Sequence, residues 1–341
     1  MWLNLTTDER LEILQFVSSE SRIPIHAVEK DWWVTRVLEA LFSSCAADSF
    51  IFKGGTSLSK GWDVIHRFSE DIDIDIGINR ELLGFSGALS KNQISDKLRR
   101  ASKTFVDNEL KDIISQGLWQ QGIDSSQFEI YTEETPISTT DPRKIYIKYK
   151  SVTDHSMAYI GKEVHVEAGA RSIIDPSSSK AISSLIDLIL PDQKFARPSF
   201  NAKVTPIGRT FLEKAFLLHE EFSKPKEKIR NHRMSRHMYD LEKLMDYSEA
   251  MDYLFDSEMY MNIIEHRKKF IHLQGFDYET LYPQTINLIP IDDSVLTAWE
   301  NDYKSMRSEM IYGETLSFDT LIDRLKELQG RFREAAIAGL T

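Results

Sequence analysis

The stretch that decides the fold runs from residue 53 to residue 75 and reads KGGTSLSKGWDVIHRFSEDIDID. A short β-prone run, 49–53, leads into it, and the pair Gly54-Gly55 then opens a segment of helical character. The last part, 71–76, alternates strictly between acidic and apolar residues, which is typical of a β-strand with one buried face. The stretch therefore predicts a strand, a glycine turn, a short helix and a second strand.

The aspartates of this second strand are expected to share one face. Residues two apart on a strand point the same way, so Asp71, Asp73 and Asp75 project together at intervals of roughly 6.6 Å. Aspartate is disfavoured in strands and like charges repel, so a bound cation explains the pattern, and Mg²⁺ prefers such oxygen ligands. The alternative is an exposed strand that uses aspartate for solubility or against edge-to-edge pairing.

The glycine turn supplies a second chemical feature. Without Cβ atoms, Gly54 and Gly55 let the backbone approach an anion closely, and the start of the next helix directs N–H groups at it. Thr56 and Ser57 add hydroxyl donors. A Gly-Gly pair alone is often only a turn. Next to an acidic strand, however, it supplies both halves of a nucleoside triphosphate site, which are donors for the outer phosphates and ligands for a metal.

The rest of the chain predicts a mixed α and β first half followed by helices. Thr6 and Glu9 form a capping-box pattern at the start of a helix. The other expected helices cover 25–42, 91–118, 211–222, 235–247, 250–272, 292–311 and 317–337, strands lie near 127–132, 143–150 and 162–168, and loops cover 175–179 and 191–206. We therefore expect an α+β fold with an N-terminal domain, 1–200, and a helical C-terminal domain, 201–341.

The composition limits the classes of protein that the sequence can encode. Of 341 residues, 41% are hydrophobic and 28% are charged, which is typical of a globular chain. The single cysteine, Cys45, can form no internal disulfide, and no long apolar run predicts a membrane span. We expect a cytoplasmic protein without membrane contact. A net charge of −11 argues against general nucleic-acid binding, although basic runs such as 224–236 interrupt the acidic background.

The motif resembles that of a known family. A GG[ST] turn followed by an Asp-x-Asp strand is similar to the signature of DNA polymerase β-like nucleotidyltransferases, and the fuller string KGGTSL...RFSEDIDI resembles the AbiEii/AbiGii-type toxin branch. Three other segments are similar to motifs of that branch: EKDWWVTRVLEAL at 29–41, LEKAFLLHE at 212–220 and SRHMYDLEKL at 235–244. The resemblance implies a polymerase β-like nucleotidyltransferase domain with a mixed sheet, and a toxin of a type IV toxin–antitoxin or abortive-infection system.

The resemblance also implies roles for individual residues. The metal-holding aspartates map onto Asp71 and Asp73, and Ser69 lies close to the expected γ-phosphate. The later lysine of the family falls on Lys214, where it would neutralise triphosphate charge, and Asp240 would orient that lysine or help to deprotonate the attacking hydroxyl. The phosphate-binding set is Lys53, Gly54, Gly55, Thr56, Ser57 and Ser69. Without the resemblance, Lys214 reads as an ordinary exposed helix residue and Asp240 as a partner of Arg236.

A third carboxylate is expected on a neighbouring strand. Glu167 is the best candidate, because Glu163, His165 and Glu167 alternate on one face of a run that falls where the fold requires a strand. Asp75 is expected to play a supporting part. Arg171, just beyond this strand, would contact phosphate or pair with a structural acid, and both possibilities stay open.

The function that the resemblance implies is transfer of a nucleotide from an NTP to an acceptor hydroxyl with Mg²⁺, or Mn²⁺, as cofactor. The implied acceptor is the 3′ end of tRNA, which blocks translation, and the implied partner is a cognate antitoxin. Two alternatives remain. One is transfer to a protein hydroxyl, including the protein's own Ser69, or to a small molecule. The other is a non-catalytic module that senses nucleotides or binds a partner.

Overall fold

A computed structural model describes residues 1–69, 71–76, 93–153, 161–171 and 176–335. The chain divides into two compact units. The first unit comprises Met1–Asp63 and Phe68–Thr205, and the second comprises Val64–Arg67 and Pro206–Thr341. The short segment Val64–Arg67 therefore belongs to the second unit, although it lies within the stretch that connects the glycine turn to the acidic strand.

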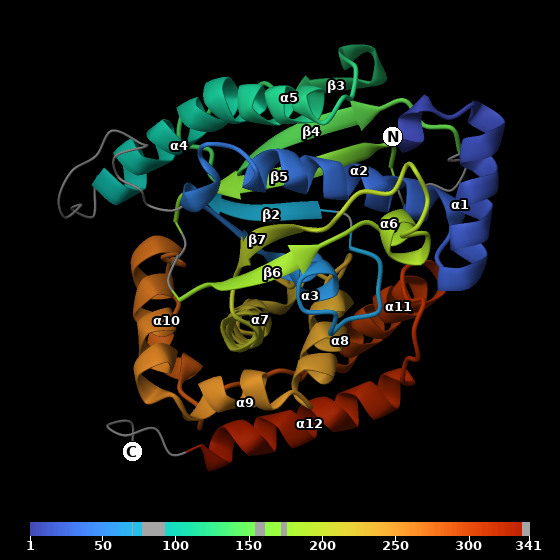
Figure 1. The fold of residues 1–341 in the computed structure, drawn as a ribbon. Coiled ribbons are helices and arrows are strands. Elements are labelled where there is room, and N and C mark those ends of the chain that lie inside the picture. The colour runs from blue at the N-terminus through green and yellow to red at the C-terminus, as the bar shows by residue number, and fades with distance from the viewer. Residues whose placement is uncertain (70, 77–92, 154–160, 172–175, 336–341) are drawn as a thin grey trace. The chain divides into compact units, whose positions relative to one another are not determined.

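The first unit is built on one seven-stranded mixed sheet with the order β3-β4-β5-β2-β1-β7-β6 (Figure 1). Its strands are β1 (Phe50–Lys53), β2 (Asp71–Ile76), β3 (Phe128–Tyr131), β4 (Arg143–Tyr149), β5 (Glu163–Gly169), β6 (Ser178–Ile182) and β7 (Phe200–Val204). The acidic strand β2 is central, because it pairs antiparallel with β1 on one side and parallel with β5 on the other. A parallel pair also joins β1 to β7, and the remaining pairs are antiparallel.

Six α-helices of the first unit are α1 (Thr7–Ser21), α2 (Ile25–Phe42), α3 (Gly54–Lys60), α4 (Arg99–Phe105), α5 (Lys111–Gln120) and α6 (Leu185–Ile189). The predicted capping box is confirmed, because the Thr6 hydroxyl accepts from the Glu9 N–H and the Glu9 carboxylate accepts in return. The long helix expected over 91–118 is confirmed from residue 93, with π-helical turns before and after α4. Residues 91 and 92 lie outside the described residues.

The core of the first unit lies between the sheet and α2, which crosses one face of the sheet (Figure 1). The isoleucines of β2 are fully buried on this face. Trp33 of α2 stacks on Tyr149 of β4 with ring centroids 5.2 Å apart, and Phe42 contacts Phe50 and Phe52 of β1. The two faces of β2 are therefore divided as its period-two pattern predicts. The apolar side chains enter the core, and the aspartates occupy the opposite face.

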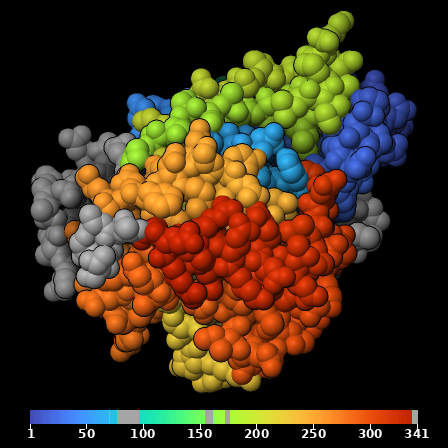
Figure 2. All heavy atoms as spheres, turned by 90° about the horizontal axis from the view of Figure 1, so that it is seen from below, coloured from blue at the N-terminus to red at the C-terminus, as the bar shows by residue number. Residues whose placement is uncertain are grey.

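The second unit is helical, as predicted. Its helices are α7 (Ile207–Phe222), α8 (Ser235–Leu244), α9 (Ser248–Phe255), α10 (Ser257–Phe270), α11 (Asp293–Glu309) and α12 (Phe318–Glu334). Aromatic pairs fill its core. The ring centroids of Phe222 and Trp299 are 4.7 Å apart, and Phe211 stacks on Phe332 with ring centroids 5.7 Å apart. The outer side of α12 forms part of the surface of this unit (Figure 2).

The α+β fold class is confirmed, but three local predictions are wrong. Strand β6 begins inside the expected loop 175–179, and β7 lies inside the expected connection 191–206. These two strands pair with each other and β7 pairs with β1, so pairing across the chain determines them and a polar edge strand gives little local signal. The helix expected over 250–272 is two helices, because Asp256 breaks it and caps α10.

Within the described part of the chain, no helix combines the length and the apolar character that crossing a membrane requires.

Candidate active site

The glycine turn and the acidic strand lie against each other in the first unit. Gly54 begins α3 with a φ of +75°, a conformation that side chains rarely adopt. A Cβ atom built at Gly54 would lie 2.1 Å from Oδ2 of Asp73, far inside van der Waals contact. The residue just before the turn, Lys53, is the direct cross-strand neighbour of Asp73. The structure thus brings together the two halves that the sequence predicts.

A buried hydroxyl network joins α3 to the start of β2. Thr56 is fully buried, and its Oγ1 lies 2.5 Å from the backbone carbonyl oxygen of Asp71 and 2.9 Å from Oγ of Ser69. The Ser57 hydroxyl donates to the carbonyl of Gly54 at 2.9 Å. The sequence predicts these hydroxyls as phosphate donors; in this structure each donates its one proton inside the network. The first turn of α3 adds backbone N–H groups that can donate to an anion.

The three aspartates of β2 share a face but differ in environment. Asp71 and Asp73 are partly exposed, whereas Asp75 is 1% exposed. The Asp75 carboxylate forms an ion pair with the ammonium group of Lys53, a predicted phosphate ligand. Because a buried carboxylate needs such a partner, Asp75 restrains the position of Lys53, and its supporting part in the reaction stays a prediction. In this ion pair the side chain of Lys53 is 30% exposed to solvent.

Glu167, the predicted third carboxylate, lies directly beside Asp73 in the parallel pair of β5 and β2. Its Oε1 is 2.5 Å from the ammonium group of Lys144 on β4. One row along, Nδ1 of His165 lies 3.3 Å from Oδ1 of Asp71. Over the residues that the structure describes, no three His, Cys, Asp or Glu side chains converge as a metal-binding group. The candidate ligand set is therefore the pair of aspartates, with Glu167 adjacent to it.

This pair fits a hard divalent cation. Two carboxylates project from one strand face, and neither is buried in the core. The Asp73 carboxylate occupies the volume that a side chain at residue 54 would need, so the absence of a Cβ at Gly54 lets this carboxylate lie against the turn. Carboxylates in such a place leave positions for water and phosphate oxygens, which Mg²⁺ requires.

The structure decides between the two possibilities for Arg171. Its guanidinium group contacts the carboxylate of Asp141 and donates to the carbonyl of the same residue at 2.6 Å. The Asp141 side chain is 1% exposed and also accepts from the Ala170 N–H at 3.2 Å. Arg171 therefore neutralises a structural acid at the end of β5.

In the second unit, the two remaining predicted residues form a buried ion cluster. Nζ of Lys214 on α7 lies 2.8 Å from Oδ2 of Asp240 on α8. Arg67 binds the same carboxylate through two N–H groups, at 2.7 and 2.8 Å. The Asp240 side chain is 0% exposed and that of Lys214 is 9% exposed, so Lys214 is no ordinary surface lysine. The structure pairs Asp240 with Lys214, which is one of the two roles expected for it.

The charged groups of this cluster shift one another's pKa values. Burial alone would raise the pKa of Asp240, but Arg67 and Lys214 outweigh it and hold that pKa below its usual range. Burial, together with the nearby Arg67 cation, lowers the pKa of Lys214 although Asp240 opposes the shift. A carboxylate held by two cations is a poor proton acceptor, so the geometry favours orientation of Lys214 over deprotonation of a hydroxyl.

Arg67 and His165 were not predicted as site residues. Arg67 lies inside the decisive stretch, but its partner is 173 residues away and no local period indicates the pairing. The alternation of His165 with Glu163 and Glu167 places it on the acidic face, and this was the only available signal.

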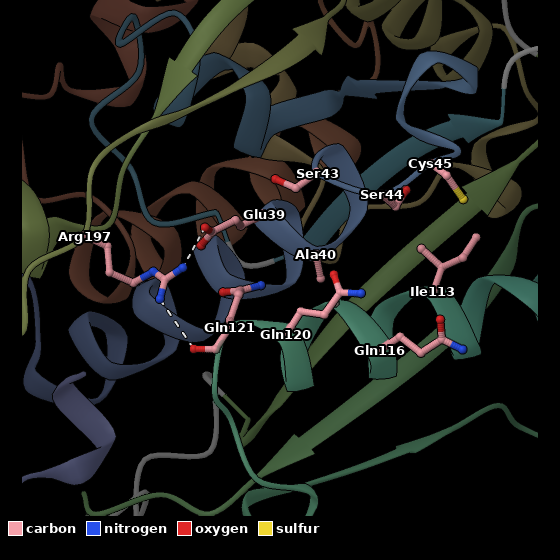
Figure 3. A pocket seen from close by; sticks show the side chains of 11 residues that line it. Glu39, Ala40, Ser43, Ser44, Cys45, Ile113, Gln116, Gln120, Gln121 and Arg197 are labelled. Carbon is pink, nitrogen blue, oxygen red and sulfur yellow. Dashed lines mark hydrogen bonds and ion pairs between the residues drawn. The ribbon is translucent and has the colours of Figure 1, made fainter.

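A pocket of about 420 Å³ lies elsewhere in the first unit, between α2 and α5 (Figure 3). Arg197 crosses it, with its guanidinium group 2.9 Å from the Glu39 carboxylate and 3.5 Å from the carbonyl of Gln121. None of its lining residues is a predicted site residue. Glu39 and the Gln121 carbonyl hold the Arg197 guanidinium group there, and the pocket is not the site that the sequence predicts.

The basic run 224–236 is partly neutralised. The buried Glu221 carboxylate binds Lys224 at 2.8 Å and Arg230 at 2.6 Å, and Lys226 pairs with Asp292 at 2.8 Å. The run is largely exposed, so it remains a candidate surface for phosphates, but with less free charge than its composition suggests.

This chain resembles a known protein family and several solved structures. A family model described as "Nucleotidyl transferase AbiEii toxin, Type IV TA system" matches residues 36–324. The last family motif in the sequence analysis ends at residue 244, whereas the family model matches as far as residue 324. Curated protein sequences provide no match.

Two solved structures are similar over nearly the whole chain. MenT4, a nucleotidyltransferase toxin from Mycobacterium tuberculosis, is 15% identical with a TM-score of 0.44, and the alignment covers 94% of this chain and 97% of that one. JHP933 from Helicobacter pylori is 14% identical with a TM-score of 0.38, and the alignment covers 90% and 98%. Because the family model covers far more than half of the chain, this protein belongs to the AbiEii family of nucleotidyltransferase toxins from type IV toxin–antitoxin systems.

Proposed function

We propose that this protein transfers a nucleotide from an NTP to the 3′ end of tRNA in an Mg²⁺-dependent reaction, and thereby blocks translation. The family supports nucleotidyl transfer. The observation that carries the proposal is the close approach of Gly54 to Asp73, because it places the start of a helix beside the acidic strand. Donors for phosphate and ligands for a cation then serve one triphosphate.

In this reaction the acceptor hydroxyl oxygen attacks the α-phosphorus, and the bond from that phosphorus to the β-phosphate oxygen breaks. Pyrophosphate leaves with the bonding electrons. Asp71 and Asp73 would hold Mg²⁺, which when bound neutralises phosphate charge and stabilises the attacking and departing oxygens. The first-turn N–H groups of α3 bind the outer phosphates. The proton of the hydroxyl passes to a carboxylate of the acidic face, and Glu167, which lies beside Asp73, is the candidate acceptor.

Lys214 and Asp240 have complementary parts in the proposal. Lys214 compensates charge on the triphosphate, and Asp240 orients its ammonium group. The 2.8 Å ion pair and the second cation on Asp240 support this division of roles. A cognate antitoxin would control the activity, as the toxin family implies.

The test is incorporation of label from each of four α-labelled NTPs, with Mg²⁺, into deproteinised RNA and separately into cell protein. We expect label in tRNA. Label found only in cell protein, or on Ser69 of this protein itself, would show that the chain is a nucleotidyltransferase whose acceptor is a protein hydroxyl instead of tRNA. Absence of transfer to both, with an intact cellular effect of the variant Asp71→Ala, would refute catalysis.

Removal of the carboxylates tests the metal site. Asp71→Asn and Asp73→Asn are each expected to slow transfer by at least about 100-fold, since each removes a charged ligand of the proposed cation. Asp192→Asn, at an exposed loop position, is the matched control and is expected to keep the wild-type rate. A chelator is expected to abolish transfer, and added Mg²⁺ or Mn²⁺ to restore it; a full rate with chelator present contradicts the metal requirement.

A further inference from the structure

An aromatic row extends from the candidate metal site across the polar face of the sheet. The residues in register are Asp71 on β2, His165 on β5, Tyr146 on β4 and Tyr131 on β3. Their side chains are in contact along the row: His165 lies 3.3 Å from Asp71, its ring meets Tyr146 edge to face at 5.0 Å, and Tyr146 stacks on Tyr131 at 5.1 Å. We call Tyr131, Tyr146 and His165 the aromatic row.

The rings are only half-buried, although they are large and lie in the body of a sheet. They occupy the face opposite to the apolar core, so packing of that core does not account for them. Strand β3 ends the sheet order, and therefore no described strand covers the outer side of Tyr131. The three side chains are therefore partly accessible to solvent, and among the described residues no further strand pairs with the β3 end of the row.

The hydroxyl groups of the row are held by acids. The Tyr131 hydroxyl donates to Oε1 of Glu163 at 2.9 Å. Burial and this carboxylate raise the pKa of Tyr131 to about 12, and burial together with Glu133 raises the pKa of Tyr146. Both phenols stay neutral near pH 7, so the row presents uncharged rings in fixed orientations.

The position of the row indicates which substrate it faces. The glycine turn follows β1, on one side of β2, and the proposed phosphate donors lie there. The aromatic row starts on the other side of β2 and crosses β5, β4 and β3. An acceptor that approaches the α-phosphorus opposite to the leaving pyrophosphate comes from this second side.

The chemistry of the row matches an unpaired nucleic-acid strand. Nucleobases stack on aromatic rings whatever their sequence, and cations beside the rings bind the phosphates. Lys144 and Lys148 flank Tyr146 on the same face of β4, and both are exposed, although Lys144 also pairs with Glu167 and Lys148 lies opposite Glu163. From Asp71 to Tyr131 the row spans three strand spacings, or roughly 14 Å. This length suits a short run of nucleotides better than a small molecule.

We propose that the aromatic row binds the unpaired nucleobases next to the accepting 3′ hydroxyl. This inference rests on the proposed function, because it deepens the acceptor side of the same site. It requires a single-stranded nucleic-acid end that continues the stack at Tyr131, with phosphates near Lys144 and Lys148. The alternative is a cross-strand aromatic cluster that only stabilises the sheet.

The experiment compares Tyr131→Leu and Tyr146→Leu with the wild-type protein. Each variant keeps an apolar side chain but removes the ring. We expect the KM for an RNA acceptor with an unpaired 3′ end to rise about tenfold, and the KM for NTP to stay within about twofold. Tyr131→Phe keeps the ring and is expected to recover most of the lost affinity. The matched control is Tyr247→Leu, at an exposed tyrosine of the second unit.

A binding measurement separates this inference from the proposed function. Fluorescence anisotropy of a 5′-labelled single-stranded RNA, with no NTP present, reports the affinity directly, and thermal unfolding checks the fold of each variant. Equal RNA affinity of wild type and both leucine variants overturns the inference even if RNA is labelled. Weaker RNA binding by the variants supports the inference even if no RNA is labelled, and then only the proposed transfer fails. A raised KM for NTP instead of RNA assigns the row to the donor base and also overturns it.

Discussion

Gly54 occupies a position that no residue with a side chain fits. Its φ is +75°, and a Cβ would lie 2.1 Å from Oδ2 of Asp73. Gly54→Ala is therefore expected to lower the free energy of unfolding by about 1–3 kcal/mol and to abolish nucleotide transfer. Denaturant unfolding and the labelling assay measure the two effects.

The matched control is Gly161→Ala, because a Cβ at Gly161 meets no atom of the described residues within 4 Å. We expect it to keep stability and activity. Wild-type activity of Gly54→Ala would show that the contact between the turn and Asp73 has no part in catalysis.

His219 is expected to make the stability of the second unit depend on pH. Its Nδ1 accepts from the Asn287 N–H at 2.8 Å, and Nε2 lies 3.0 Å from the Thr280 hydroxyl. Burial lowers the pKa of His219 to about 4. Below its unfolded pKa of about 6.5, the unfolded chain binds a proton that the folded chain does not, so folding weakens by about 2 kcal/mol between pH 7 and pH 5.

Denaturant unfolding across this pH range measures the effect. The variant His219→Gln is expected to have a lower free energy of unfolding at pH 7. That free energy is also expected to fall less between pH 7 and pH 5 than it does in the wild type. His232→Gln, at an exposed histidine, is expected to keep the wild-type slope. An unchanged slope in His219→Gln would show that another group is responsible.

At the scale of elements, Thr56 connects α3 to β2. Its fully buried hydroxyl contacts the Asp71 carbonyl and Ser69. Thr56→Val keeps the shape but leaves that carbonyl without its donor, so we expect a loss of about 1–2 kcal/mol in the free energy of unfolding and a higher KM for NTP. Thr56→Ser keeps the hydroxyl and is expected to keep the KM. Equal KM values for both variants would contradict a positioning role.

The elements that the sequence predicts well are those whose pattern is local. The alternation of β2 and the apolar spacing of α2 give their bounds, because each element buries one face against the same core. Strands β6 and β7 were missed because their pairing is set by distant residues. The same holds within the site: the turn and Asp73 were expected together, whereas the Arg67 partner of Asp240 depends on packing that no local spacing encodes.

At the scale of the molecule, the charge of −11 must be reconciled with the proposed RNA substrate. The double variant Lys226→Glu/Lys228→Glu reverses two exposed cations of the run 224–236. We expect weaker RNA labelling with a shallower salt dependence, since fewer counterions are released, and unchanged NTP binding.

The control is Lys304→Glu/Lys326→Glu, whose lysine side chains are 61% and 62% exposed on α11 and α12. If the two double variants label RNA equally well, the run 224–236 has no part in acceptor binding.

The placement of Val64–Arg67 in the second unit has a consequence for how this protein can be divided. Arg67 is one of the two cations on the buried Asp240, and it also bridges to Ile311. A fragment that ends at Thr205 would therefore carry an arginine without its acid, and the complementary fragment would carry Asp240 with one cation fewer. The helical half is thus no interchangeable module: exchanging it between homologues requires exchanging four residues from the middle of the nucleotide motif as well.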